Sequence, residues 1–327
     1  PEGSREYIVP SRLHEGSFYV LPQSPQQLKQ LLMIASFDKY FQIARCFRDE
    51  DQRGDRQPEF TQLDMEMSFV DMEEAMDLNE RMMKDVVKKF AKDKKVTPFR
   101  RLKYHEAMNL YGSDKPDLRF GLEMTDICEE VKNCDFKVFS ETVKNGGAVK
   151  ALKVDGGAKF TRSQLDDLEA LAKENGAKGL AYLVIDHDGN LKSPIVKFFK
   201  KEELDLIISK CDAKKGDIIF FAADKWDKCC GILGLVRLKI ADYLNLKNEN
   251  IFAFCWVTHF PLFEYSHEDK RFVSVHHPFT SPTDEYVENM ESDLGSVLSK
   301  SYDMVLNGVE IGGGSIRIYD QNLQARI

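Results

Sequence analysis

Polar side chains of the types that bind substrates and phosphates are concentrated between Phe47 and Met67, in the sequence FRDEDQRGDRQPEFTQLDMEM. The aromatic and branched residues 40–47 predict a strand that ends just before Arg48. Residues 60–69 alternate in polarity, which predicts a second strand with two unlike faces. One of those faces carries acceptor groups, namely Gln62, Asp64 and Glu66. Acceptors opposite an arginine suit an ammonium beside a phosphate or carboxylate; the alternative is a solvated hairpin, as most charged loops are.

A second cluster of chemically useful residues lies near the C-terminal end of the sequence. Asn307-Gly308 predicts a two-residue hairpin between apolar strands, flanked by the carboxylates of Asp303 and Glu310. Two such carboxylates suit Mg²⁺ bound to phosphate oxygens. The glycines 312–314 leave room for a ligand against the backbone, or form only a bulge. Arg317 follows, and its planar fork matches a carboxylate with two hydrogen bonds.

Elements that position further polar residues are also predicted. Ser24 as N-cap and Pro25 at the first helical position indicate a helix whose buried stripe is Leu28, Leu31 and Leu32. Gln26 and Lys29 share one side of this helix, either toward a ligand or toward solvent.

A pair of histidines, His276 and His277, precedes Pro278 in the sequence HHPFTSP. Histidine is readily placed for substrate contact near neutral pH, so a substrate contact is one interpretation. A polar loop without a binding role is the other.

Composition limits the class of protein. The 327 residues carry a net charge of −8, which argues against a general nucleic-acid coat. Seven cysteines without a Cys-x-x-Cys pair predict reduced thiols rather than disulfides or zinc. No apolar run approaches the ~20 residues that span a bilayer. No signal-peptide pattern opens the sequence, and a first residue of Pro1 suggests a truncated start. We therefore expect a soluble, cytoplasmic protein that does not associate with membranes.

The distribution of polar clusters and predicted secondary structure along the chain indicates three segments. Residues 1–120 contain the first polar cluster, and residues 251–327 contain the histidines, the glycine run and Arg317. Between them, residues 121–250 alternate strands with helices and predict a separate α+β domain.

The run FRDE…RxxRQPEFTQLDxE resembles motif 2 of class II aminoacyl-tRNA synthetases, in the form carried by bacterial-type aspartyl-tRNA synthetases. PEGSRE at the start is similar to the end of motif 1, with Ser4 and Glu6 in place of the commoner Ala and Asp. QSPQQLKQ and HHPFTSP match further family sequences. The resemblance implies an α+β fold: an antiparallel sheet flanked by helices and interrupted by an inserted smaller α+β domain.

The resemblance also implies roles for particular residues. It implies that aspartate is bound by Glu2, Gln26, Lys29, Arg48, Asp64, His276 and Arg317. It implies that ATP is bound by Arg48, Glu50, Gln57, Phe60 and Glu310, and Mg²⁺ by Asp303 and Glu310. Lys29 would face the side-chain carboxylate of aspartate, Asp64 its ammonium, and Phe60 the adenine ring. His277 would be a supporting group.

The implied reaction needs no protein nucleophile. The α-carboxylate of L-aspartate attacks the α-phosphorus of ATP, which gives aspartyl-adenylate and pyrophosphate, and the aspartyl group then passes to the 3′ end of tRNA(Asp). Catalysis is positioning and charge neutralisation, with Arg48 as the catalytic residue. Selectivity against asparagine would come from Lys29 and Arg317, because an amide leaves both cations poorly paired.

The family is longer at both ends. The anticodon-binding domain, most of motif 1 and motif 3 are missing, so we expect an internal fragment that is inactive alone and belongs to a homodimeric enzyme. Asparaginyl- and lysyl-specific relatives are alternatives, but the inserted domain and the Lys29–Arg317 pair argue against both. A different alternative is a catalytically incomplete, synthetase-like regulatory protein that binds an amino acid or RNA. The intact Arg48, Asp303 and Glu310 argue against it.

Overall fold

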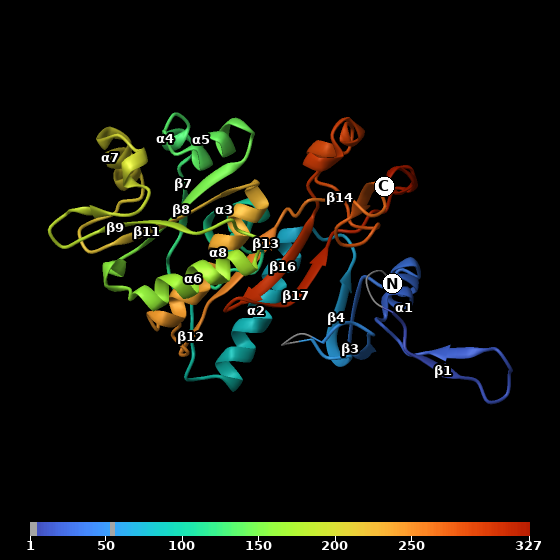
Figure 1. The fold of residues 1–327 in the computed structure, drawn as a ribbon. Coiled ribbons are helices and arrows are strands. Elements are labelled where there is room, and N and C mark those ends of the chain that lie inside the picture. Colours follow the sequence, from blue (N-terminus) through green and yellow to red (C-terminus); the bar gives the residue numbers. More distant parts are fainter. Residues whose placement is uncertain (1–4, 53–55) are drawn as a thin grey trace. The chain divides into compact units, whose positions relative to one another are not determined.

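The computed structural model describes residues 5–52 and 56–327 as a mixed α+β fold (Figure 1). Glu2, which the resemblance implicates in binding aspartate, lies outside the described residues. The chain packs as two units, Pro1–Arg81 and Met82–Ile327, and each is described by itself below. Among the described residues, no helix has the length and apolar character needed to cross a membrane.

The first unit contains two antiparallel strand pairs and a short helix. Its elements are β1 (Ile8–Pro10), β2 (Phe18–Val20), α1 (Gln26–Ile34), β3 (Lys39–Phe47) and β4 (Glu59–Met67). The β3–β4 pair is in register over nine residues, from Lys39 opposite Met67 to Phe47 opposite Glu59. The two strands predicted around the motif 2 loop are therefore confirmed to within one or two residues at each end.

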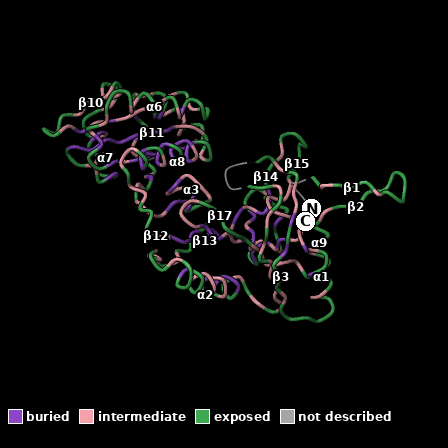
Figure 2. The backbone as a smooth tube through the Cα atoms, turned by 90° about the horizontal axis from the view of Figure 1, so that it is seen from below, coloured by how far each residue is buried: buried purple, intermediate pink, exposed green. Residues whose placement is uncertain are grey.

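On helix α1 and strand β4, polar residues are more buried than the apolar residues beside them, contrary to the prediction for α1. Leu28 and Leu31 of α1 are 67% and 60% exposed, whereas Lys29 on the same helix is buried. On β4 the side that carries Asp64 is the more buried one, and Leu63 is exposed. The predicted leucine stripe is wrong at Leu28 and Leu31, whereas Leu32 is half-buried, because α1 turns Lys29 inward instead. Figure 2 shows the same exposure along β1 and β2.

The start of α1 also differs from the prediction. Pro25 occupies the N-cap position, and no side chain caps the helix. A proline fixes its own φ near the helical value, so it defines the helix start without a hydrogen-bonding cap. Ser24 is therefore not the cap.

Helix α2 (Met72–Phe90) begins at a reciprocal cap. Asp71 Oδ1 accepts from the Glu74 backbone N–H at 2.8 Å, and Glu74 Oε2 accepts from the Asp71 N–H at 2.9 Å. Met76 is buried, but Phe90 is 76% exposed. The inward face therefore does not continue to the C-terminal end of α2.

The second unit contains a four-stranded sheet with the order β17-β16-β13-β6. Its strands are β6 (Arg100–Lys103), β13 (Phe254–Thr258), β16 (Ser301–Leu306) and β17 (Val309–Ser315). β13 and β16, and β16 and β17, are antiparallel as expected, while β6 and β13 form a parallel pair. Parallel neighbours need a long crossover, and residues 104–253 between them contain a whole further sheet.

That further sheet has five antiparallel strands in the order β10-β9-β11-β8-β7. They are β7 (Met124–Asp126), β8 (Ala148–Val154), β9 (Ala181–Ile185), β10 (Leu191–Lys192) and β11 (Ile218–Asp224). Helices α6 (Arg162–Glu174) and α8 (Trp226–Tyr243) cover one face. Helices α4 (Cys128–Val131), α5 (Lys137–Lys144) and α7 (Lys201–Lys210) cover the other (Figure 1). The α+β character predicted for this stretch agrees with these elements, while the boundaries at 120/121 and 250/251 stay a prediction.

Short elements complete the second unit. They are β5 (Lys95–Val96), α3 (Tyr104–Tyr111), β12 (Ile251–Phe252), β14 (Phe263–Ser266), β15 (Arg271–Ser274) and α9 (Gln321–Arg326). Ala253 separates β12 from β13. Asp320 caps α9, accepting from the backbone N–H groups of Asn322 and Leu323 at 2.7 and 2.9 Å.

The hairpin predicted at Asn307-Gly308 is confirmed. Both residues have positive φ, 52° and 87°, as the tight turn between β16 and β17 requires. The register then shifts, because Met304 pairs with Gly312 while Val305 pairs with Glu310, so Ile311 is the extra residue of a bulge. The bulge reverses the faces of β17 beyond Glu310, which simple alternation does not predict.

Candidate amino-acid and nucleotide site

In the first unit, a buried lysine joins helix α1 to two carboxylates of strand β4. Lys29 Nζ lies 2.8 Å from Asp64 Oδ1 and 3.2 Å from Glu66 Oε2. All three side chains are largely buried, so this ion cluster is desolvated and held by the short helix-to-strand contact. Lys29 and Asp64, which the sequence assigned to opposite ends of the substrate, therefore contact each other here.

Among the described residues of the same unit, Asp64 Oδ2, an acceptor, and Gln26 Nε2, a donor, are buried and have no hydrogen-bond partner within the protein. A buried polar atom without a partner costs roughly 1–3 kcal/mol, so such atoms call for an explanation. An amino-acid backbone offers the matching groups, an ammonium for the carboxylate oxygen and a carboxylate for the amide nitrogen.

The arginine at the exit of β3 packs on the aromatic ring predicted to contact adenine. The Arg48 guanidinium carbon lies 5.1 Å from the centroid of the Phe60 ring, within the range of a cation–π contact. Its Nε donates to the Gln23 carbonyl oxygen at 3.3 Å. Glu50 accepts from Arg56 Nη1 at 3.1 Å, while Gln57 is exposed in the following loop. These contacts fix the plane of Arg48 in the absence of a nucleotide.

In the second unit, Arg317 is held by a histidine and a serine. Arg317 Nη1 donates to His277 Nε2, and to Ser315 Oγ at 2.7 Å. Because the guanidinium can only donate, Nε2 of His277 accepts and the ring proton sits on Nδ1, 2.9 Å from Thr280 Oγ1. These contacts align the Arg317 side chain, and the supporting role of His277 toward a substrate stays a prediction. The guanidinium also lies 5.0 Å from the Phe279 ring centroid.

Asp303 lies directly against the glycine run. A Cβ on Gly313 would meet Asp303 Oδ1 at 2.1 Å, so a larger residue at that position would require this carboxylate or the strand to move. Burial raises the pKa of Asp303 to about 8, with further increases from the negative charges of Glu310 and Asp114. A carboxylate with so high a pKa gains from a nearby cation, which fits the predicted use of Asp303 and Glu310 for Mg²⁺.

The linker ahead of the five-stranded sheet reaches this carboxylate pair. Lys115 Nζ lies 3.7 Å from Glu310 Oε2, and Lys115 opposes the increase in the Asp303 pKa. Among the described residues, no group of three or more His, Cys, Asp or Glu side chains is arranged to hold a metal ion. Two carboxylates suffice for Mg²⁺ that keeps its waters and phosphate oxygens as ligands.

His276 packs edge-on against Phe260, with ring centroids 5.0 Å apart. Burial lowers the pKa of His276, and the charges of Glu310 and Asp114 oppose that shift. The histidine is therefore biased toward its neutral form, in which it can both donate and accept a hydrogen bond.

Some residues at these sites carried no predicted role. Glu66 forms a second ion pair with the Lys29 ammonium. Its place two residues after Asp64, on the same polar face of β4, is the sequence pattern that could have indicated this contact. Lys115 lies in the sequence YGSDKPDLR, whose turn residues gave no indication of the Glu310 contact. A contact between segments nearly 200 residues apart has no local sequence signal.

Comparison with known proteins gives a consistent result. The model of the family "tRNA synthetases class II (D, K and N)" matches residues 1–327. The chain is 51% identical to the aspartate–tRNA ligase of Agathobacter rectalis over 327 residues, which are 100% of this chain and 55% of that protein. It is 52% identical to the aspartate–tRNA(Asp/Asn) ligase of Caldanaerobacter subterraneus subsp. tengcongensis, with the same shares covered. The chain thus spans about half the length of the curated relatives it matches.

Among solved structures, an aspartyl tRNA synthetase from Entamoeba histolytica aligns with a TM-score of 0.39 and 16% identity, covering 94% of this chain and 40% of that one. That likeness is too low to support an argument. The family model, which matches from the first residue to the last, is decisive: the chain belongs to the class II tRNA synthetases of the D, K and N group.

Proposed function

We propose that this chain is part of an aspartate–tRNA ligase, which activates L-aspartate with ATP to aspartyl-adenylate and transfers the aspartyl group to the 3′ end of tRNA(Asp). Identity of 50–52% to ligases with that printed specificity supports the choice of amino acid. We also propose that the full-length protein forms a homodimer. In the same proposal, the inserted domain extends from residue 121 to residue 250.

The observation that carries the proposal is the pair of unsatisfied buried atoms beside Lys29. Asp64 Oδ2 would accept from the ammonium of aspartate, and Gln26 Nε2 would donate to its α-carboxylate. Lys29 supplies the positive charge for the side-chain carboxylate of aspartate. Its ion pairs with Asp64 and Glu66 fix the position of its ammonium group. A substrate amino acid with a neutral side chain, such as asparagine, would offer the Lys29 ammonium no carboxylate to pair with. This difference is the basis of selectivity for aspartate.

For ATP, the contacts support a role of Arg48 on the α-phosphate and of Phe60 against the adenine ring. The cation–π contact of Arg48 with Phe60 keeps the guanidinium plane fixed, so little reorganisation is needed when phosphate binds. Glu50 and Gln57 would contact the nucleotide from the loop.

In the second unit, Asp303 and Glu310 would hold Mg²⁺, which neutralises negative charge on phosphate oxygens when bound. Glu310 would exchange its contact with Lys115 for the metal. Arg317, aligned by His277 and Ser315, would pair with a carboxylate, and His276 would contact the amino acid.

The test is ATP–pyrophosphate exchange by the full-length protein with aspartate, asparagine or lysine as the amino acid. The proposal predicts exchange that depends on aspartate and is at least ~10⁴-fold weaker in kcat/KM with asparagine. Faster exchange with asparagine or lysine than with aspartate would show that the enzyme is specific for that amino acid instead. No exchange with any of the three amino acids would favour a synthetase-like binding protein.

A further inference from the structure

A pocket of about 360 Å³ opens beside the five-stranded sheet, on the side covered by α8 and α3. It lies within the second unit, and none of its lining residues belongs to the predicted aspartate or ATP site. Its volume is at the lower end of the range for small-molecule sites, roughly 300–1,000 Å³. The pocket therefore has room for a small ligand of its own.

The most unusual lining residue is a buried lysine in the middle of β8. Lys150 is 2% exposed and pairs in register with Asp126 of β7 and Ala222 of β11, so it stands on a central strand. Its neighbours on the same face, Ala148 and Leu152, are apolar core residues. An ammonium in such a position costs several kcal/mol to desolvate unless it is well paired.

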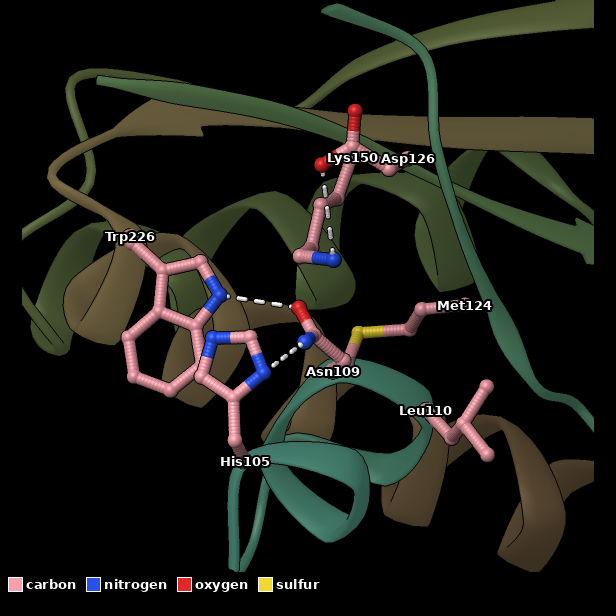
Figure 3. Close-up of a pocket in the computed structure, with 7 residues that line it drawn as sticks. All are labelled: His105, Asn109, Leu110, Met124, Asp126, Lys150 and Trp226. Atoms are coloured by element: carbon pink, nitrogen blue, oxygen red, sulfur yellow. Dashed lines mark hydrogen bonds and ion pairs between the residues drawn. The ribbon is translucent and has the colours of Figure 1, made fainter. Parts of the chain in front are cut away.

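The partner within the protein pairs with Lys150 only loosely. Lys150 Nζ lies 3.7 Å from Asp126 Oδ2, beyond hydrogen-bond distance, and the Asp126 side chain is 54% exposed. Figure 3 shows Lys150 directed from the sheet toward Asn109 of α3. The ammonium thus has hydrogen-bonding capacity directed into the pocket.

The walls of the pocket are flat and apolar. Trp226 at the start of α8 stacks on His105 of α3, with ring centroids 4.6 Å apart and planes within 5°. Met124 and Leu110 lie on the opposite side in Figure 3. A planar apolar group fits between such surfaces.

The polar groups of the wall are fixed by one another. Trp226 Nε1 can only donate, and it donates to Asn109 Oδ1 at 2.8 Å, which turns the Asn109 amide nitrogen to His105 Nδ1 at 2.7 Å. His105 Nδ1 therefore accepts this hydrogen bond. This network holds the aromatic wall rigid and leaves Lys150 as the one ammonium among the seven lining residues.

We propose that this pocket binds a small planar molecule with a single negative charge, such as an aromatic carboxylate, whose anionic group pairs with Lys150 while its ring lies against the apolar side chains of the wall. A monoanion is favoured over a phosphate dianion because only one ammonium is present and Asp126 repels additional negative charge. None of the seven lining residues belongs to the predicted aspartate site.

The experiment is a ligand-observed NMR titration of the full-length protein with benzoate as the probe, in the presence of saturating aspartate and ATP. Benzyl alcohol and benzylamine, of the same shape but neutral or cationic, are the comparison probes. The proposal predicts saturable benzoate binding with a millimolar Kd, at least ~10-fold tighter than for either comparison probe.

Three variants locate the site. Lys150→Met is expected to weaken benzoate binding at least ~10-fold. Asp126→Asn, on an exposed side chain, is expected to strengthen it several-fold because it removes the competing carboxylate. Lys153→Met is the matched control: Lys153 lies on the same strand, pairs with Asp155 at 2.7 Å and does not line the pocket, so binding should not change.

Three results would overturn the proposal. They are no saturation by benzoate at concentrations up to ~50 mM, equal binding of all three probes, or equal effects of the changes at Lys150 and Lys153. Should Lys150→Met fail to fold, the direction of the Asp126→Asn effect decides, since unchanged or weaker benzoate binding there contradicts the site.

Discussion

Lys29 Nζ lies 2.8 Å from Asp64 Oδ1, and the second oxygen of the same carboxylate is buried without a partner. One carboxylate thus anchors a cation of the protein with one oxygen and offers the other to a ligand. In the proposed function that ligand is the ammonium of aspartate. The relationship links the stability of the first unit to substrate binding, and both can be measured.

Lys29→Met is expected to destabilise the first unit by about 3–5 kcal/mol, because it leaves the buried carboxylates of Asp64 and Glu66 without their cation. The measurement is the urea midpoint of the variant. Lys39→Met, which removes an exposed lysine at the start of β3, should change stability by less than about 0.5 kcal/mol. Equal effects of the two changes would contradict the buried ion cluster.

Arg317→Leu is expected to lower kcat/KM for aspartate in pyrophosphate exchange by at least ~10³-fold, since a carboxylate loses its bidentate partner. Arg317→Lys should not restore activity, because an ammonium cannot replace the planar fork held by His277 and Ser315. Near-normal affinity of the Arg317→Leu variant for aspartate would exclude this residue as a selectivity determinant.

Gly313→Ala places a methyl group where Asp303 Oδ1 now lies, so the carboxylate or the strand must move. We expect a loss of about 1–3 kcal/mol in stability and a higher KM for Mg·ATP. Gly312→Ala is the control, because no atom lies within 4 Å of its added Cβ. Both thermal unfolding and exchange kinetics should separate the two variants.

Asp303 gives a specific dependence of stability on pH. Its pKa is raised from 3.8 to about 8, so between these values the folded chain retains a proton that the unfolded chain has lost. The contribution of Asp303 to stability is therefore complete below about pH 4 and is lost as the pH rises through about 8. Asp303→Asn removes this dependence, so its stability relative to the unaltered protein should increase from pH 5 to pH 8. If the difference between the urea midpoints of the two proteins stayed constant from pH 5 to pH 8, the raised pKa of Asp303 would be contradicted.

Arg237 in α8 is expected to hold the linker before the five-stranded sheet. It is 1% exposed, and its Nη2 donates to the carbonyl oxygens of Asp117, Phe120 and Gly121 at 2.8–3.1 Å. Arg237→Met should cost about 3 kcal/mol or more, because these carbonyl groups lose their donor. Lys239→Met, at an exposed position of the same helix, should have little effect on thermal unfolding. A similar loss in both variants would argue against the linker role.

How far the sequence predicts this fold depends on the range of the interactions. The β3–β4 pair and the Asn307-Gly308 turn follow from local patterns and are confirmed. The exposure of Leu28 and Leu31 was not predicted, because periodicity identifies an apolar face but not what that face packs against. The bulge at Ile311 likewise depends on pairing with a strand, not on local composition.

The candidate site divides in the same way. Arg48, Asp64 and Lys29 were identified from motif chemistry, and their roles toward a substrate stay predictions. The contact of Lys115 with Glu310 and the buried position of Lys150 arise from packing between distant segments. Such contacts are visible only in the folded chain.

The central claim is that the buried polar cluster of the first unit binds aspartate. The most direct test is the equilibrium affinity of the full-length protein for aspartate, measured for Lys29→Met and Gln26→Met against the Lys39→Met control. Gln26→Met should retain the fold, since it removes a donor that has no partner, and should weaken aspartate binding about 10-fold. Lys29→Met should abolish binding, and Lys39→Met should leave it unchanged. Normal aspartate affinity in a folded Gln26→Met or Lys29→Met protein would contradict the account.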